Sequence, residues 1–183
     1  MHRLLFLFLR AKLLSLALPD SSSPLLREVD WYFGQDNLDD PEAPMFAVPA
    51  CYIEFLPADF ARQSGGGQLL RQQFRLHLVT QVGSYDQVTQ AINGPMAHHE
   101  LLDYLYISIQ GLGAKASDLP ELADLVNTTD DFVLMNQINR TGIEPGYDGT
   151  MLLKTSLTFE ALCFDPAAIK NYQTISARLV VTR

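Results

Sequence analysis

Five segments of the chain have the alternating or continuous apolar pattern of β-strands. They are residues 29–33, 46–55, 74–80, 132–138 and 152–164. In the third segment, Phe74, Leu76 and Leu78 alternate with Arg75, His77 and Val79. This alternation predicts one apolar row against a core and a mostly polar row on the outside. His77 is therefore expected to be an ordinary outward-facing strand residue, not a ligand.

Two further segments have the pattern of helices. Over residues 98–112, the residues His98, Leu102, Leu105, Ile109 and Leu112 follow the spacing of one buried stripe, which Leu101 widens, while His99, Asp103, Tyr106 and Gln110 form the opposite stripe. Residues 1–18 form an apolar run interrupted by Arg10 and Lys12, followed by Pro19 and a serine cluster. We interpret this run as an N-terminal helix that packs on the domain, and a secretory leader is the alternative.

Glycine-rich and acidic segments connect these elements. Residues 34–44 are an acidic loop, residues 56–68 contain three consecutive glycines and are interpreted as a mobile excursion or a hairpin tip, and residues 119–126 are interpreted as a short helix or turn. Segments 132–140 and 151–164 read as the arms of a hairpin with an extended tip at 141–150, and residues 179–181 as a last short strand. The order predicts a single α+β domain over residues 1–183, with an antiparallel or mixed sheet and long loops.

Composition and charge narrow the classes of function. Hydrophobic residues make up 48% of the chain and charged residues 19%, values typical of a folded globular protein. The net charge is -8, with 13 basic and 21 acidic residues, which argues against a protein that wraps nucleic acid tightly. An acidic surface would suit a passage through which DNA slides without binding. The two cysteines, Cys51 and Cys163, lie in apolar strands and are expected to be buried free thiols.

The strongest candidate for chemistry is the sequence His99-Glu100-Leu101-Leu102-Asp103. It has the outline of the H-E-x-x-H zinc motif with Asp103 in place of the second histidine, and no histidine follows it in the chain. A small metal-dependent hydrolase built on His99, Glu100 and Asp103 is therefore kept only as an alternative. The G-x-G-x-x-A match at Gly111 follows a helix, where glycine ends helices, and the acidic loop lacks the EF-hand pattern.

Nothing in the sequence supplies the rest of a catalytic apparatus. There is no G-x-S-x-G sequence, and both cysteines lie within apolar strands. We therefore predict no catalytic residues, no cofactor, no metal and no enzymatic activity.

In this order, the segments resemble the tail terminator and tail completion proteins of long-tailed bacteriophages, in the form found in phages and prophages of Bacteroidetes. The resemblance rests on the N-terminal helix, on Asp30-Trp31-Tyr32-Phe33-Gly34-Gln35 and on Phe46-Ala-Val-Pro-Ala-Cys-Tyr-Ile-Glu-Phe55. It continues through Phe74-Arg-Leu-His-Leu-Val79, Ile109-Gln-Gly-Leu112 and Phe159-Glu-Ala-Leu-Cys-Phe-Asp165.

The resemblance implies a structural virion protein of the viral tail or neck. Such a subunit assembles in the host cytoplasm into a homo-oligomeric ring, commonly a hexamer, that caps the tail tube and joins it to the head. Its implied partners are the tail tube protein and a head-side neck or adaptor protein, while DNA passes through without specific binding and no membrane is involved. A head completion or neck adaptor protein is the nearest rival interpretation, and a secreted binding module is a more distant one.

Two glycine-containing loops are the predicted contact regions of such a ring. The residues expected to contact neighbouring subunits or the tube are Arg62, Gln63, Gly65, Gly66, Gly67, Gln68, Ile143, Glu144, Tyr147 and Asp148. The acidic residues Asp130, Asp131, Glu144 and Asp148 are the candidates for charges that line the lumen.

Overall fold

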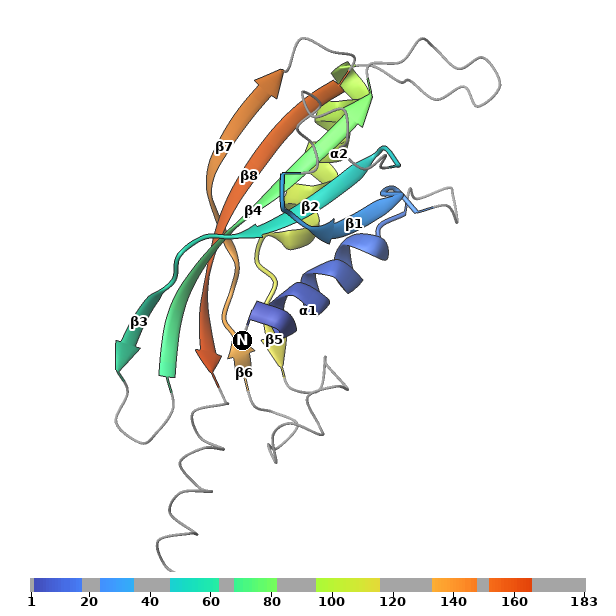
Figure 1. The fold of residues 1–183 in the computed structure, drawn as a ribbon. Coiled ribbons are helices and arrows are strands. Elements are labelled where there is room, and N and C mark those ends of the chain that lie inside the picture. Colours follow the sequence, from blue (N-terminus) through green and yellow to red (C-terminus); the bar gives the residue numbers. More distant parts are fainter. Residues whose placement is uncertain are drawn as a thin grey trace, which may run out of the picture.

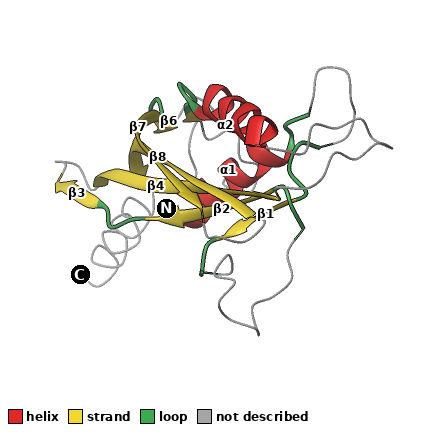
Figure 2. Ribbon diagram, turned by 90° about the horizontal axis from the view of Figure 1, so that it is seen from above, coloured by secondary structure: helices red, strands yellow, loops and turns green. Residues whose placement is uncertain are grey.

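The structure is a computed structural model, and it describes residues 2–17, 24–34, 47–62, 68–81, 95–115, 133–147 and 152–165. These residues form one β-sheet with two α-helices on one of its faces (Figures 1 and 2). Within this part of the chain, eight strands form a mixed sheet in which only β1 and β2 run parallel. The predicted α+β class, with a mixed sheet packed by an N-terminal and a central helix, is confirmed.

The centre of the sheet is the pairing of two long antiparallel strands, β4 (Gln68–Gln81) and β8 (Leu152–Asp165). Each has 14 residues, and they pair over their full length, from Gln68 opposite Asp165 to Gln81 opposite Leu152. At about 3.3 Å per residue, such a pair is roughly 45 Å long. Every other strand of the described sheet pairs with β4 or β8, either directly or through one intervening strand.

Different strands flank the two ends of the long pair. At one end, β2 (Ala50–Phe55) and β1 (Glu28–Trp31) lie beside β4, and β7 (Asn139–Tyr147) lies beside β8. At the other end, β3 (Asp59–Arg62) lies beside β4, while β6 (Val133–Met135) and β5 (Ala114–Lys115) follow β8. The sheet twists strongly between these ends, as Figure 1 shows.

The helices α1 (His2–Leu14) and α2 (Pro95–Ile109) cover the same face of the sheet, which we call the helix face (Figure 2). Buried residues of α1 (Leu5, Phe8, Leu9 and Leu13) and of α2 (Leu102, Leu105 and Ile109) pack into one core with the inward rows of β2, β4 and β8. We call the other face of the sheet the open face, because no helix of the described residues lies on it. Neither helix is long and apolar enough to span a bilayer.

The predicted helices form with shifted ends. The helix expected over 98–112 begins at Pro95 and ends at Ile109. Proline suits the first turn of a helix, and Gly111 adopts a φ of 82° and donates its N–H to the carbonyl of Ile138, so the chain leaves the helix there. The predicted N-terminal helix is confirmed as α1, packed against the core. The buried state of Cys51 and Cys163 is also confirmed, and burial raises the pKa of each thiol to about 12.

Three predicted boundaries differ from those in the structure. The expected hairpin tip at 141–150 is largely strand, because residues up to Tyr147 belong to β7 and pair with β8. Pro145 is tolerated there because β7 has no partner strand other than β8 in the described chain.

Segment 56–68, expected to be a mobile excursion or a hairpin tip, contains β3, and its last residue begins β4. These two strands pair antiparallel, which agrees with the hairpin alternative. The strand expected over residues 29–33 spans Glu28–Trp31. Val29 is buried, while Trp31 and Phe33 are 40% and 70% exposed.

The remaining predicted elements cannot be compared with the structure. The acidic loop beyond Gly34, the short helix or turn at 119–126 and the last strand at 179–181 lie outside the described residues. The single-domain assignment for 1–183 stays a prediction.

A buried histidine fixes α2 to the sheet. His98 is 3% exposed, and its Nδ1 and Nε2 lie 2.7 Å and 2.8 Å from the hydroxyl oxygens of Thr80 in β4 and Thr155 in β8. The neutral ring can donate to one threonine and accept from the other, so both of its nitrogens are satisfied. Burial, and secondarily the neighbouring His99, lower the pKa of His98 to about 4. The imidazole therefore stays neutral and bonded at neutral pH.

This pKa predicts a loss of stability on mild acidification. The unfolded chain binds a proton at His98 near pH 6.5, whereas the folded chain binds it near pH 4. The contribution of His98 is therefore complete above pH 6.5 and decreases as the pH falls toward 4. We expect a loss of about 2 kcal/mol in the free energy of unfolding between pH 7 and pH 5. Urea titrations at several pH values would measure it.

A comparison of two variants isolates the contribution of His98 from that of other groups. His98→Gln should show a smaller loss between pH 7 and pH 5 than the unsubstituted protein. His99→Gln changes the exposed neighbouring histidine and should keep most of the pH dependence. Equal pH dependence in His98→Gln and the unsubstituted protein would contradict the assignment.

Candidate functional site

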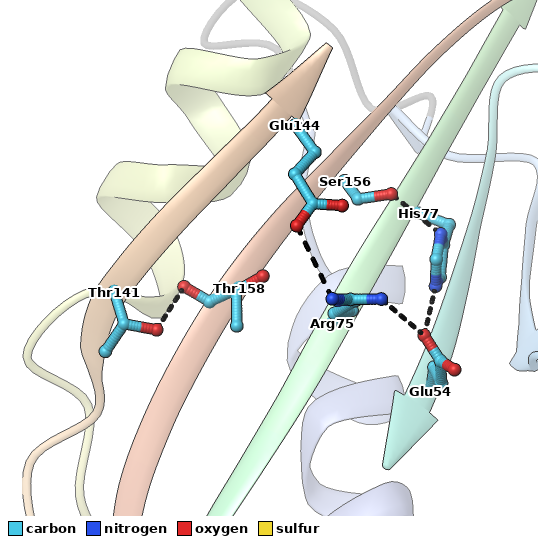
Figure 3. Close-up of polar contacts among 7 residues, drawn as sticks. All are labelled: Glu54, Arg75, His77, Thr141, Glu144, Ser156 and Thr158. Atoms are coloured by element: carbon cyan, nitrogen blue, oxygen red, sulfur yellow. Dashed lines mark hydrogen bonds and ion pairs between the residues drawn. The ribbon is translucent and has the colours of Figure 1, made fainter. Parts of the chain in front are cut away.

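The most extensive polar cluster of the described residues lies on the open face, and Figure 3 shows it in close-up. Its members are Glu54 of β2, Arg75 and His77 of β4, Glu144 of β7 and Ser156 of β8. We call them the open-face cluster. They come together because strand residues alternate between faces, so the neighbours of the buried residues Ile53, Leu76 and Leu157 point to the opposite side.

His77 is the centre of the cluster. Its Nε2 lies 2.9 Å from Oε2 of Glu54, and its Nδ1 lies 2.8 Å from the hydroxyl oxygen of Ser156. A carboxylate only accepts hydrogen bonds, so Nε2 donates to Glu54, and in the tautomer with its proton on Nε2 the ring accepts from Ser156 at Nδ1. The ring also stacks on Tyr32 at a centroid distance of 4.0 Å, and only 12% of the His77 side chain is exposed. His77 does face outward, as predicted, but its ring contacts Glu54, Ser156 and Tyr32.

Arg75 connects the middle of the sheet to its edge. Its Nη1 lies 3.8 Å from Oε2 of Glu54, and its Nη2 lies 3.4 Å from Oε1 of Glu144, two strands away across β8. Next to it, the hydroxyl of Thr141 in β7 donates to the carbonyl of Thr158 in β8 over 3.4 Å. These contacts add side-chain links to the backbone pairing of the edge strand β7 (Figure 3).

Charge on the open face is nearly balanced. Beyond the cluster, Nε of Arg71 lies 3.5 Å from Glu160, and the amide of Gln73 donates to the same carboxylate over 3.3 Å. The guanidinium groups of Arg71 and Arg75 are thus neutralised by carboxylates of the same sheet. A phosphate-binding surface needs unneutralised basic groups, so this part of the open face is not suited to gripping DNA.

An apolar patch lies beside the cluster on the same face. Ala50, Tyr52 and Val79 are fully buried, and Tyr32, Val48 and Leu152 pack against them. The hydroxyl of Tyr52 donates to Glu28 over 3.2 Å. Tyr32, on which His77 stacks, is thus held by packing against this patch, and this fixes the orientation of the imidazole.

The contacts of Glu54, His77 and Ser156 follow the order acid, base and nucleophile. Ser156, however, lies in the interior of β8, with His77 of β4 opposite it on one side and Glu144 of β7 on the other. Backbone N–H groups in such a ladder bond to neighbouring strands, whereas an oxyanion hole needs N–H groups aimed at the substrate. The contacts of the three side chains link β2, β4 and β8 across the open face.

The alternative metal site does not gain a third ligand. His99 and Asp103 are both exposed on α2. Within the described residues, no group of three or more histidine, cysteine, aspartate or glutamate side chains is placed to hold a metal ion. The absence of enzymatic activity stays a prediction.

The predicted contact residues divide into three groups. Arg62 and Gln68 lie opposite each other where β3 and β4 meet. Ile143, Glu144 and Tyr147 lie in β7, where Ile143 is 52% exposed and Glu144 is paired with Arg75. Gln63, Gly65, Gly66, Gly67, Asp148, Asp130 and Asp131 lie outside the described residues. Their contact and lumen roles stay predictions.

The sequence analysis did not predict the open-face cluster. A signal was present, since Glu54, Arg75, His77 and Ser156 are polar residues at outward positions of strands. What was missing was the register that places His77 opposite Ser156 in β8 and opposite Tyr52 in β2, two residues before Glu54 on the same face. Comparison with known proteins adds no assignment: no protein-family model matches the chain, and no curated protein matches it.

The contacts of His77 predict its contribution to stability. His77→Ala removes the stacking on Tyr32 and leaves Glu54 and Ser156 without their ring partner, which should cost about 1–3 kcal/mol in the free energy of unfolding. His99→Ala makes the same chemical change at an exposed helix position and should cost ~0.5 kcal/mol or less. Urea unfolding, followed by the fluorescence of the single tryptophan, Trp31, measures both. Equal costs would show that the cluster does not stabilise the sheet.

Proposed function

We propose that this protein is a phage tail terminator: a structural virion subunit that forms a homo-oligomeric ring, caps the tail tube and joins it to the neck. The observation that carries the proposal is the one-sided architecture, with both helices on one face of a long twisted sheet. The segments on which the family resemblance rests are parts of this architecture: α1, β1, β2, β4, the end of α2 and β8. Such a subunit acts by its shape and its number of copies, without a catalytic step.

Two edge strands of the described sheet, β1 and β7, favour a closed ring over open-ended strand pairing. The edge strand β1 is covered by Arg10 of α1, whose Nε donates to the carbonyl of Val29 over 3.0 Å. The edge strand β7 has a bulge between Arg140 and Gly142 and contains Pro145. Bulges, prolines and covering side chains are the features that prevent sheets from joining edge to edge. Neighbouring subunits are therefore expected to contact each other through side chains, and rotational symmetry then closes the ring.

One end of the sheet offers a surface for the tail tube. Phe60 of β3 is 61% exposed and lies close in sequence to Arg62, Gln63 and Gln68, which the sequence analysis assigned to partner contacts. An exposed aromatic residue at the end of a rigid strand pair suits a contact with another protein. The net charge of -8 suits a ring through which DNA passes without binding. The head-side neck protein would contact the opposite end of the ring.

The proposal predicts control of tail length. Tail tube protein of the same phage, polymerised in the presence of this chain, should give shorter tubes capped at one end by a ring, because the ring occupies the growing end. Without the chain, the tubes should be longer and open. Negative-stain electron microscopy would measure tube length and end structure.

Particles assembled without this chain separate the terminator from its nearest rival. Overlong tails support termination, whereas filled heads lacking tails beside tails of normal length would indicate a head completion protein. A chain that stays monomeric with tubes and leaves their length unchanged would contradict the proposed function.

A further inference from the structure

The edge strands of the described sheet differ in how far they are protected. Four strands, β1, β3, β5 and β7, have a single strand partner there. An arginine covers β1, a bulge and a proline interrupt β7, and β5 has two residues with a register shift between them. β3 has four residues in regular register with β4 and, within the described part of the chain, none of these features. Its outer side is therefore available to a further strand.

β3 also has side chains that suit a strand partner of a particular kind. Phe60 lies opposite the buried Leu70, so it is on the helix face, yet it is 61% exposed. Asp59 is exposed and forms no ion pair within the described residues. Because backbone groups alternate in direction along a strand, half of the N–H and C=O groups of β3 point away from β4. A fitting partner combines apolar residues beside Phe60 with a basic residue near Asp59.

The sequence beyond β8 has this character. Residues 166–183 lie outside the described residues, and the sequence analysis predicts a last short strand at 179–181, which is Leu-Val-Val. Residues 166–183 include Lys170, Arg178 and Arg183 and no acidic residue, in a chain whose net charge is -8. The segment is therefore complementary in charge to the rest of the chain.

The end of β8 lies close to β3. Gln68 of β4 pairs with Arg62 of β3 on one side and with Asp165 of β8 on the other, so β3 and β8 end in the same row of the sheet (Figure 1). At the usual strand spacing, these two ends are about 10 Å apart. Residues 166–178 can span ~40 Å when extended. A segment that returns along the outer side of β3 would run antiparallel to it and would bring Arg183 toward Asp59.

We propose that residues 179–181 pair with the outer edge of β3 in the same chain, as an additional antiparallel strand. The partner is the same chain because the short connection keeps the segment near this edge at an effective concentration on the order of millimolar. This inference does not depend on the proposed function. In a ring subunit, the added strand would belong to the end of the sheet that is proposed to face the tail tube.

Disulfide trapping tests the pairing. Phe60→Cys is combined in turn with a cysteine at 179, 180 or 181, so that in any register at least one pair lies on the same face. Mild oxidation should give an intramolecular disulfide in at least one variant, detected by non-reducing electrophoresis and peptide mass spectrometry. Ile143→Cys, at a 52% exposed position of the protected edge strand β7, is the matched control. Combined with the same three cysteines, it should form at least tenfold less disulfide.

Amide hydrogen exchange keeps the test decisive if no cysteine pair has the geometry of a disulfide. Of Val180→Pro and Val181→Pro, one removes an N–H that points toward β3, and it should make the outward amides of β3 exchange at least tenfold faster. Val180→Ile and Val181→Ile keep the strand preference and should keep the protection. Unchanged exchange at the centre of β4 and β8 shows that each variant is folded.

The outcomes separate the same-chain pairing from its alternatives. A selective intramolecular disulfide at Phe60, or loss of protection in the proline variants alone, supports the proposal. Disulfides that join two chains would show that another copy occupies the edge, and would overturn pairing within the chain. Equal disulfide yields at Phe60 and Ile143, with exchange in β3 unchanged by proline, would overturn the added strand. None of these results changes the expected tube length, so the terminator proposal is tested separately.

Discussion

The structure depends above all on the full-length pairing of β4 with β8. Two 14-residue strands in one register define a long, twisted frame. Strands β2, β3, β6 and β7 pair directly with it, and β1 and β5 pair with β2 and β6. Because side chains alternate along a strand, this single register assigns residues to the two faces of the sheet. A slip of one residue between β4 and β8 would separate His77 from Ser156 and would disrupt the stacking of Phe74 on Phe159 in the core. The core and the open-face cluster are therefore two results of one constraint.

The helix face and the open face of the sheet each hold one histidine, in different surroundings. His98 enters the core from α2 and is held neutral between two threonine hydroxyls, so its hydrogen bonds link the helix to the sheet. His77 lies on the open face between a carboxylate and a serine hydroxyl, with an aromatic ring stacked on it. In both cases each ring nitrogen has a partner, which is what buried imidazoles require. The contacts of His77 that resemble a catalytic relay thus also satisfy polar groups that the sheet partly buries.

The proposed assembly role draws on a body whose described helices both lie on one face of the sheet. In that proposal, the bulge and proline of β7 and the arginine cover of β1 limit open-ended growth, so identical copies can meet without forming fibres.

The sequence by itself determined the elements whose pattern is local. Period-two alternation located β4 and β8, and helical spacing located the buried stripe of α2, because side-chain direction depends only on neighbouring residues. It did not determine that 141–147 is strand or that β3 exists, since glycine, proline and polar residues become strand there only by pairing with β8 and β4. Nor did it determine the open-face cluster, whose members come from four strands. Only the tertiary structure decided these features, because strand register is set by contacts between residues far apart in the chain.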